Sequence, residues 1–114
     1  MITVVGIKSC DTCRKALAWL TAQNVAHNFH DLRADGLGPE RLSAWVKACG
    51  WEAVLNRRST TWRSLTEAEK ADVTAEKAET LMIANPTLIK RPVFEAANAV
   101  YIGFTDAVKK ALEP

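Results

Sequence analysis

Hydrophobic and polar residues follow one another along this chain with a period that changes from segment to segment. Residues 2–5 are β-branched throughout, as in a strand buried on both faces, and Gly6 marks the end of the run. Apolar residues then recur at helical spacing over residues 12–23, which predicts an amphipathic helix. In residues 25–32, apolar Val25 and Phe29 stand among polar neighbours, which predicts a second strand. The first third of the chain therefore predicts a strand-helix-strand unit.

The middle of the chain carries helical signals. Residues 39–49 begin with a proline and end before Gly50, and their apolar residues recur at helical spacing. Residues 66–69 read Thr-Glu-Ala-Glu, the pattern of a capping box in which a hydroxyl and a carboxylate satisfy free backbone N–H groups. A further helix is predicted over residues 75–84. We therefore expect a helical insertion over about residues 38–85.

The last segment returns to strand patterns. Residues 87–96 and 98–104 predict two strands joined by a short turn, and Thr105 is a candidate cap for a final short helix. Strand-helix-strand, helices and strand-strand-helix is the thioredoxin-like order with helices inserted in its middle. The predicted fold is thus α/β, a single thioredoxin-like domain over residues 1–114.

Composition narrows the class of protein. The chain has 114 residues, 48% hydrophobic and 25% charged, which is ordinary for a globular domain that folds without disulfides. A formal net charge of +2 with interspersed signs does not favour direct nucleic-acid binding. The sequence has no signal-peptide pattern and no run long enough to cross a bilayer, so we expect a cytoplasmic protein without membrane contact. Three cysteines, an odd number, suit a reducing compartment better than a secreted disulfide framework.

The sequence Cys10-Asp-Thr-Cys13 stands where the first strand ends and the first helix begins. Free backbone N–H groups at a helix N-terminus favour a thiolate over a thiol, and Lys8 and Arg14 add positive charge nearby. We therefore predict that Cys10 is a nucleophile whose thiolate Lys8 and Arg14 stabilise. Cys13, one turn along the helix, is within reach to resolve a mixed disulfide.

Two other interpretations of the cysteine pair remain open at this point. Both thiols can be small apolar residues that fill a helix-sheet interface, although charged neighbours argue against this. A zinc site needs two further ligands, for which the chain offers Cys49, His27 and His30. The pattern places Cys49 on an apolar helix face and the two histidines on opposite strand faces, so no metal is predicted.

Several motifs together resemble a known family. They are "VVGIKSCDTCRKALAWL", "FHDLRADGL", "GWEAVLNRRSTTWRSL" and "NPTLIKRPVF", and they span nearly the whole chain. In this combination they resemble the arsenate reductase-like family that includes ArsC, Spx and YffB, and they are closest to the YffB branch. The resemblance implies a thioredoxin-like fold with a helical insertion and a nucleophilic cysteine at Cys10.

The resemblance also implies anion-binding residues. Arsenate reductases of this type hold their oxyanion with three arginines. Arg14 and Arg91 match two arginine positions of the family, and Arg58 or Arg57 stands near the arginine of the middle region. The functional hypothesis is that Lys8, Arg58, Arg91 and Pro92 bind the substrate. The alternative for Arg57 and Arg58 is that they belong to a solvated basic loop.

The late strand departs from the arsenate enzymes. Where those enzymes carry another arginine, this chain has Gly103 and Phe104, which weakens an arsenate function because an oxyanion pocket depends on charged donors. The resemblance further implies a cis peptide bond between Arg91 and Pro92. The exposed backbone at Pro92 is expected to pair with the peptide backbone of glutathione.

The leading hypothesis is a glutathione-dependent thiol-disulfide oxidoreductase with Cys10, Cys13 and Arg14 as catalytic residues. Glutathione would be a co-substrate, no cofactor would be bound, and glutaredoxin is a possible further partner. Arsenate reduction is an enzymatic alternative at the same site. The alternative from another class is an Spx-like redox-sensing regulator that binds RNA polymerase and uses its Cys-x-x-Cys as a switch.

Overall fold

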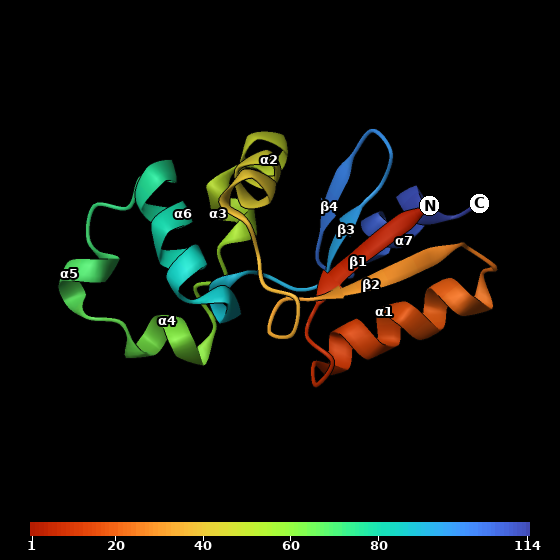
Figure 1. The fold of residues 1–114 in the computed structure, drawn as a ribbon, viewed down its shortest axis with the longest axis horizontal. Coiled ribbons are helices and arrows are strands. Elements are labelled where there is room, and N and C mark those ends of the chain that lie inside the picture. Colours follow the sequence, from red (N-terminus) through yellow and green to blue (C-terminus); the bar gives the residue numbers. More distant parts are fainter. The chain divides into compact units, whose positions relative to one another are not determined.

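The computed structural model describes residues 1–114 and divides into two compact units (Figure 1). The sheet unit consists of Met1–Gly36 and Arg91–Pro114, and the helical unit consists of Leu37–Lys90. The elements of the sheet unit are β1 (Ile2–Gly6), α1 (Asp11–Ala22), β2 (His27–Asp31), β3 (Val93–Glu95), β4 (Val100–Ile102) and α7 (Asp106–Leu112). This order confirms the predicted strand-helix-strand and strand-strand-helix segments, and the fold is thioredoxin-like.

The sheet has four strands in the order β2-β1-β3-β4. β1 pairs in parallel with β2, where Gly6 stands opposite Asp31, and antiparallel with β3, where Val4 stands opposite Phe94. β3 and β4 form an antiparallel hairpin. β1 is thus a central strand, as its β-branched residues predicted, and its carboxyl end leads directly toward the cysteine pair.

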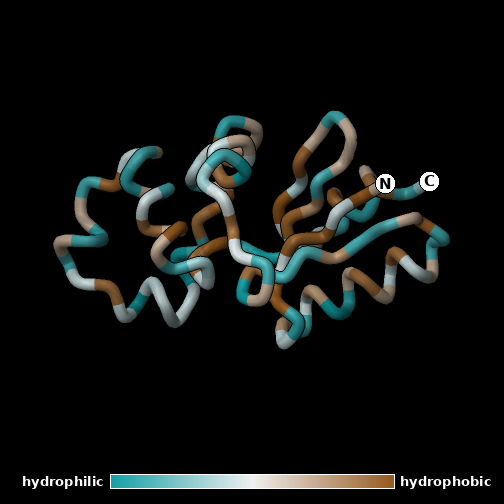
Figure 2. The backbone as a smooth tube through the Cα atoms, viewed as in Figure 1, coloured by the Kyte–Doolittle hydropathy of each residue, from teal (hydrophilic) through white to brown (hydrophobic).

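One face of the sheet carries the core of this unit. Val4 and Phe94 are fully buried there beneath two helices, which contribute Ala16 and Leu20 from α1 and Val108 and Leu112 from α7. Figure 2 shows hydrophobic and hydrophilic positions alternating along α1, as expected for a helix that buries one stripe and hydrates the other. The packing of this stripe fixes where α1 begins, and therefore where Cys10 lies.

The helical unit holds six short elements. They are α2 (Pro39–Cys49), α3 (Trp51–Val54), α4 (Thr60–Ser64), α5 (Glu67–Lys70), α6 (Ala75–Ala84) and the 3-10 helix η1 (Pro86–Leu88). The predicted capping box is present, because the Thr66 hydroxyl accepts the Glu69 N–H while the Glu69 carboxylate accepts the Thr66 N–H. α2 packs against α3 and α6, with Leu42 and Trp45 fully buried. No helix of the chain is both long and apolar enough to span a membrane.

The predicted strand over residues 87–96 is wrong in its first half. Pro86–Leu88 forms a 3-10 turn, and only Val93–Glu95 joins the sheet. Ile89 makes a single antiparallel bridge to Leu55, and the Lys90 N–H donates to the Val54 carbonyl at 2.8 Å. The first part of this segment therefore pairs within the helical unit, and the second part pairs within the sheet. The local pattern of apolar residues cannot show which partner each part takes.

Candidate functional site

Cys10 is the N-cap residue of α1. Its backbone is extended (φ −83°, ψ 120°), and its carbonyl accepts the Arg14 N–H at 3.0 Å, which starts the helix. The Cys10 N–H donates to the Ile7 carbonyl at 3.0 Å, so the loop between β1 and α1 is a tight turn. This places the half-buried Cys10 sulfur beside the free N–H groups of the first helical turn, where negative charge is favoured.

The environment holds the pKa of Cys10 below its ordinary value. Burial acts in the opposite direction, but hydrogen bonds from the backbone N–H and the thiol of Cys13 outweigh it, together with a hydrogen bond and the positive charge of Arg91. Arg91 comes from the segment that leads into β3, far away in sequence. The site therefore unites a helix N-terminus with a guanidinium, the surroundings in which a thiolate is stable.

The pKa of Cys13 is shifted in the opposite direction. It is 1% exposed, and burial raises its pKa to about 11, with the neighbouring charge of Cys10 adding to the effect and a backbone hydrogen bond from Ile7 opposing it. Cys13 therefore stays protonated and donates its S–H to the Cys10 sulfur. The pair is a thiolate beside a thiol, with the charge on the more exposed sulfur.

Gly6 is a site residue that the sequence interpretation missed. Gly6 is the last residue of β1, as predicted, and it also lies against the Cys13 side chain. A Cβ at Gly6 would lie 2.4 Å from the Cys13 Sγ. The signal available in the sequence was a glycine that follows a β-branched run shortly before a cysteine motif, which indicates close approach to a backbone.

Lys8 and Arg14 lie next to the cysteine pair and have contacts of their own. The Arg14 Nε donates to the Lys8 carbonyl at 3.0 Å, and its guanidinium lies 3.8 Å from the Asp11 carboxylate. The charge of Lys8 acts on Asp31, whose pKa it helps to lower. Their predicted roles in stabilising the Cys10 thiolate stay predictions, and Arg91 is the cation whose effect on the thiolate appears in the structure.

The peptide bond between Arg91 and Pro92 is cis, as the family resemblance implied. The Pro92 side chain is fully buried, and its carbonyl accepts the Gly103 N–H at 2.8 Å. The expectation of an exposed backbone at Pro92 is therefore wrong for this residue itself, because its carbonyl belongs to the hairpin and proline has no N–H to donate. Its role in substrate binding stays a prediction.

Phe104 occupies the region where arsenate reductases carry a further arginine. Its ring meets Trp19 edge to face, with centroids 5.8 Å apart, and lies 6.2 Å from the ring of Phe94. The Lys109 ammonium lies over its outer face at 4.6 Å. The residue thus belongs to the apolar core of the sheet unit, and the structure gives it a packing role.

Arg58 lines a polar cavity of the helical unit. The cavity has a volume of about 460 Å³ and is lined by Glu52, Leu55, Asn56, Arg57, Arg58 and Lys90. The Asn56 side chain accepts the Arg58 N–H at 3.1 Å, which fixes the turn. The Arg57 guanidinium lies over the Trp51 ring at 5.1 Å. The sequence left open which of the two arginines faces the site. Of the two, Arg57 has an aromatic partner of its own.

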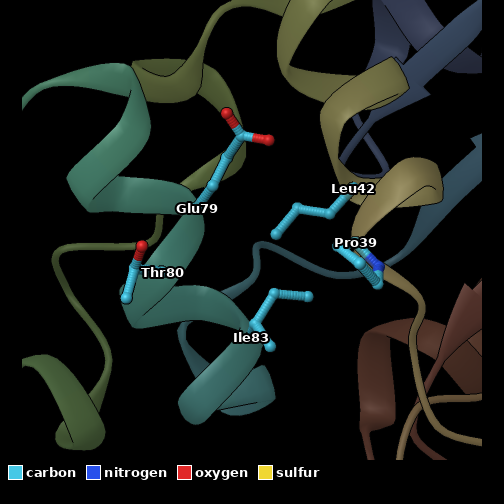
Figure 3. A pocket seen from close by; sticks show the side chains of 5 residues that line it. All are labelled: Pro39, Leu42, Glu79, Thr80 and Ile83. Atoms are coloured by element: carbon cyan, nitrogen blue, oxygen red, sulfur yellow. The ribbon is translucent and has the colours of Figure 1, made fainter.

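A second cavity of this unit is apolar. It has a volume of about 250 Å³ and lies between α2 and α6, where Leu42 and Ile83 point toward each other (Figure 3). Glu79, also on its rim, accepts a hydrogen bond from the Ser43 hydroxyl. No predicted site residue lines this cavity. It offers no thiol, cation or other group for the chemistry predicted above.

The structure contains no cluster of ligands for the alternative interpretation as a zinc site. No group of three or more His, Cys, Asp or Glu side chains is arranged to hold a metal ion. A ring nitrogen of His27 lies 2.8 Å from the Val25 carbonyl, and one of His30 lies 2.7 Å from the Gly36 carbonyl. Both histidines therefore have local backbone partners.

Comparison with known proteins identifies the family. The sequence profile of the ArsC family matches residues 5–112. The chain belongs to the ArsC family. A protein of Haemophilus influenzae of uncharacterised function is 45% identical over 106 residues, which cover 93% of each chain. The global transcriptional regulator Spx 2 of Lactococcus lactis is 26% identical over 116 residues, which cover this whole chain and 87% of the regulator.

Solved structures agree with this membership. The YffB (PA3664) protein is 44% identical and superposes over 100% of both chains with a TM-score of 0.95. An arsenate reductase (ArsC) related protein from Brucella melitensis is 41% identical, with a TM-score of 0.79 over 96% of this chain and 92% of its own. The chain is thus similar both to a protein named as arsenate reductase-related and to a protein named as a transcriptional regulator.

Proposed function

We propose that this ArsC-family chain is a glutathione-dependent thiol-disulfide oxidoreductase with Cys10 as its nucleophile. The observation that carries the proposal is the asymmetry of the cysteine pair. Cys10 is accessible and has a lowered pKa, whereas Cys13 is buried and its pKa is raised to about 11. Thiol-disulfide exchange needs such an accessible thiolate as the attacking group.

In the first step the Cys10 thiolate attacks one sulfur of a disulfide that contains glutathione. A bond forms between the Cys10 sulfur and the attacked sulfur, the original S–S bond breaks, and the other half leaves as a thiolate. Arg91 stabilises negative charge at the Cys10 sulfur before the attack and near the leaving sulfur during it. No cofactor takes part, since the electrons move within the exchanging sulfur atoms.

In the second step a thiolate must release Cys10 from the mixed disulfide. Glutathione thiolate can attack the glutathione sulfur, which yields oxidised glutathione and the Cys10 thiolate. Cys13 can instead attack the Cys10 sulfur, but burial, the largest cause of its raised pKa, persists in the mixed disulfide. Because the thiolate is the attacking species, this burial favours external glutathione over Cys13 as the resolving thiol.

Charged residues are proposed to bind the glutathione carboxylates. Arg91 is already beside Cys10, Lys8 and Arg14 stand on the adjoining turn, and Arg58 is a further candidate from the polar cavity of the helical unit. Guanidinium groups suit carboxylates because they bind them with two parallel hydrogen bonds. A reducing compartment such as the cytoplasm would supply the glutathione.

The test begins with the reduced protein and oxidised glutathione. Intact mass followed by peptide mapping should reveal one glutathione on Cys10, and added reduced glutathione should discharge it. Cys10→Ser should abolish both the adduct and glutathione-linked disulfide reduction, whereas Cys13→Ala should retain both. Glutathione turnover that survives Cys10→Ser would sink the proposal.

An Spx-like redox switch is the second candidate, and the hydrogen bond from Cys13 to Cys10 favours it. The two cysteines stand one helical turn apart, and the chain aligns in full with proteins named as Spx regulators. Rapid formation of a persistent Cys10–Cys13 disulfide without a glutathione adduct would favour the switch. Stoichiometric binding to RNA polymerase in a pull-down would then establish a regulatory role.

Arsenate reduction is the third candidate and has the least support at the site. A relative named as arsenate reductase-related shares the fold and 41% of the sequence. The region of the further arginine nevertheless holds Gly103 and Phe104, and Phe104 packs on Trp19 and Phe94. Arsenate-dependent consumption of reductant, with glutathione and glutaredoxin present, would establish this activity.

A further inference from the structure

Asp31 is the one charged or polar residue among the buried residues of the structure. It ends β2 opposite Gly6 and is 5% exposed. A carboxylate out of water is costly unless hydrogen bonds replace its hydration. The hydrogen bonds of the Asp31 carboxylate therefore indicate which segments this residue holds in place.

The carboxylate accepts three backbone N–H groups. Its Oδ1 accepts those of Arg33 at 2.8 Å and Ala34 at 3.1 Å, which close the turn after β2. Its Oδ2 accepts the N–H of Lys8 at 3.2 Å, across the sheet in the loop before Cys10. The bond from Ala34 and those from Arg33 and Lys8 hold the pKa of Asp31 below its usual range against the effect of burial.

Lys8 is held from its other side as well. Its carbonyl accepts the Arg14 Nε at 3.0 Å, so the same peptide segment is tied to β2 by its N–H and to α1 by its carbonyl. The neighbouring Ile7 carbonyl accepts the Cys10 N–H at 3.0 Å. The turn that carries Cys10 is thus anchored at successive residues, and Asp31 supplies the anchor on the strand side.

We propose that Asp31 is a positioning residue that holds the loop before α1 and thereby keeps the Cys10 sulfur against the Cys13 N–H and Arg91. This inference rests on the proposed role of Cys10 as nucleophile. Its action is through the Lys8 N–H and involves no contact with substrate. The charged groups around Asp31 are Lys8, Arg33 and Asp35, the last of which accepts the Asp31 N–H at 3.0 Å.

Asp31→Asn separates positioning from charge. An asparagine that keeps its oxygen on the Arg33 and Ala34 N–H groups must turn its NH₂ toward Lys8, where it cannot accept a hydrogen bond. Asp35→Asn is the matched control, because it also removes one negative charge from this turn but can keep its oxygen on the Asp31 N–H.

The readout is the rate at which iodoacetamide alkylates Cys10, followed by peptide mapping over a range of pH. We expect Asp31→Asn to raise the apparent pKa of Cys10 by about one unit, which lowers the thiolate fraction about tenfold at pH values well below that pKa. The more basic thiolate is also the better nucleophile, so the rate should fall about threefold well below the pKa, while the high-pH plateau should rise about threefold. Asp35→Asn should leave the profile unchanged or move it slightly to lower pH.

The opposite result has a clear meaning. Loss of a negative charge without loss of position would lower the pKa of Cys10 in both variants, and this would overturn the inference. So would a lower unfolding midpoint for Asp31→Asn with an unchanged Cys10 profile, which would indicate a purely structural role. In either case a glutathione adduct on wild-type Cys10 would leave the proposed function standing.

A second measurement applies if Asp31→Asn does not fold. In the wild-type protein, NMR signals of Lys8 and Cys10 are followed as acid protonates the Asp31 carboxylate. The inference requires the Lys8 amide and the Cys10 signals to change together with the Asp31 carboxyl. A Cys10 signal that does not respond while the Lys8 amide does would contradict it.

Discussion

Cys13 lies against the backbone of Gly6, so that a Cβ at residue 6 would stand 2.4 Å from the Cys13 Sγ and 3.4 Å from its Cβ. The contact joins the last residue of β1 to the first turn of α1. The Cys13 thiol is buried, burial raises its pKa to about 11, and its S–H is donated to Cys10. The buried position of the Cys13 side chain therefore requires a residue without a side chain at position 6.

Gly6→Ala should destabilise the protein because the new methyl group has no room beside Cys13. Overpacking of this kind costs about 1–3 kcal/mol. In the double variant with Cys13→Ala the sulfur is gone, and we expect about 1 kcal/mol or more of the loss to be recovered as coupling energy. Denaturant unfolding of the four proteins of the cycle measures this. Additive effects of the two substitutions would contradict the contact.

Arg91 should control the reactivity of Cys10 more than either neighbouring cation. Arg91→Gln removes both the hydrogen bond and the positive charge at the sulfur, so the pKa of Cys10 should rise toward the ordinary 9.0. Lys8→Gln and Arg14→Gln are the matched controls, each with one positive charge fewer in the adjoining turn. Alkylation rates as a function of pH report the three shifts. A larger shift for Lys8→Gln than for Arg91→Gln would reverse the assignment and support the role predicted from sequence.

The raised pKa of Cys13 should make the fold less stable in alkali. Below the ordinary pKa of 9.0 the thiol is protonated in both states, whereas between 9.0 and about 11 the unfolded chain loses the proton first. The free energy of unfolding should therefore fall across this window, by an amount on the order of 2 kcal/mol. Cys10, with a lowered pKa, has the opposite sign, because its contribution is present above the ordinary pKa and is lost as pH falls.

Cys13→Ala is the control for this alkaline loss. All other residues are common to both proteins, so the difference between the two unfolding curves reports the Cys13 thiol together with its coupling to Cys10. We expect the wild type to lose more stability than Cys13→Ala between pH 9 and 11. Parallel curves would indicate that the buried thiol titrates as it does in the unfolded chain.

Arg58 and Arg57 should differ in their effect on glutathione. Arg57 lies over the Trp51 ring, so Arg57→Met should mainly reduce stability, by about 0.5–1 kcal/mol, with little change in KM. Arg58→Met removes a charge from the same cavity without disturbing that ring contact, and the KM for glutathione should rise. Steady-state kinetics of the two variants tests this. Equal KM values for wild type and Arg58→Met would assign Arg58 to the solvated loop.

Local signals in the sequence were sufficient for most of the fold and for the position of Cys10 at a helix N-terminus. The capping box at Thr66, the cap at Thr105 and the helix over Ala75–Ala84 all occur as predicted, because each depends on residues within a turn or two. The same holds for Cys10, since its position between a β-branched run and an amphipathic helix places it at a helix N-terminus.

Partners from distant parts of the chain could not be assigned in this way. The sequence offered several cations for the Cys10 thiolate, and proximity favoured Lys8 and Arg14, whereas the sheet brings Arg91 to the sulfur. Likewise, nothing in the local pattern distinguishes Asp31 from other acidic residues until β1 and β2 pair in register.

The sequence by itself thus determined the order of strands and helices and the placement of the Cys10 thiol at a helix N-terminus. Periodicity and capping are interactions between near neighbours, so they can be read along the chain. Only the tertiary structure decided which cation, which glycine and which buried carboxylate surround that thiol. Electrostatic and steric effects act through space, and strand pairing and helix packing set those distances.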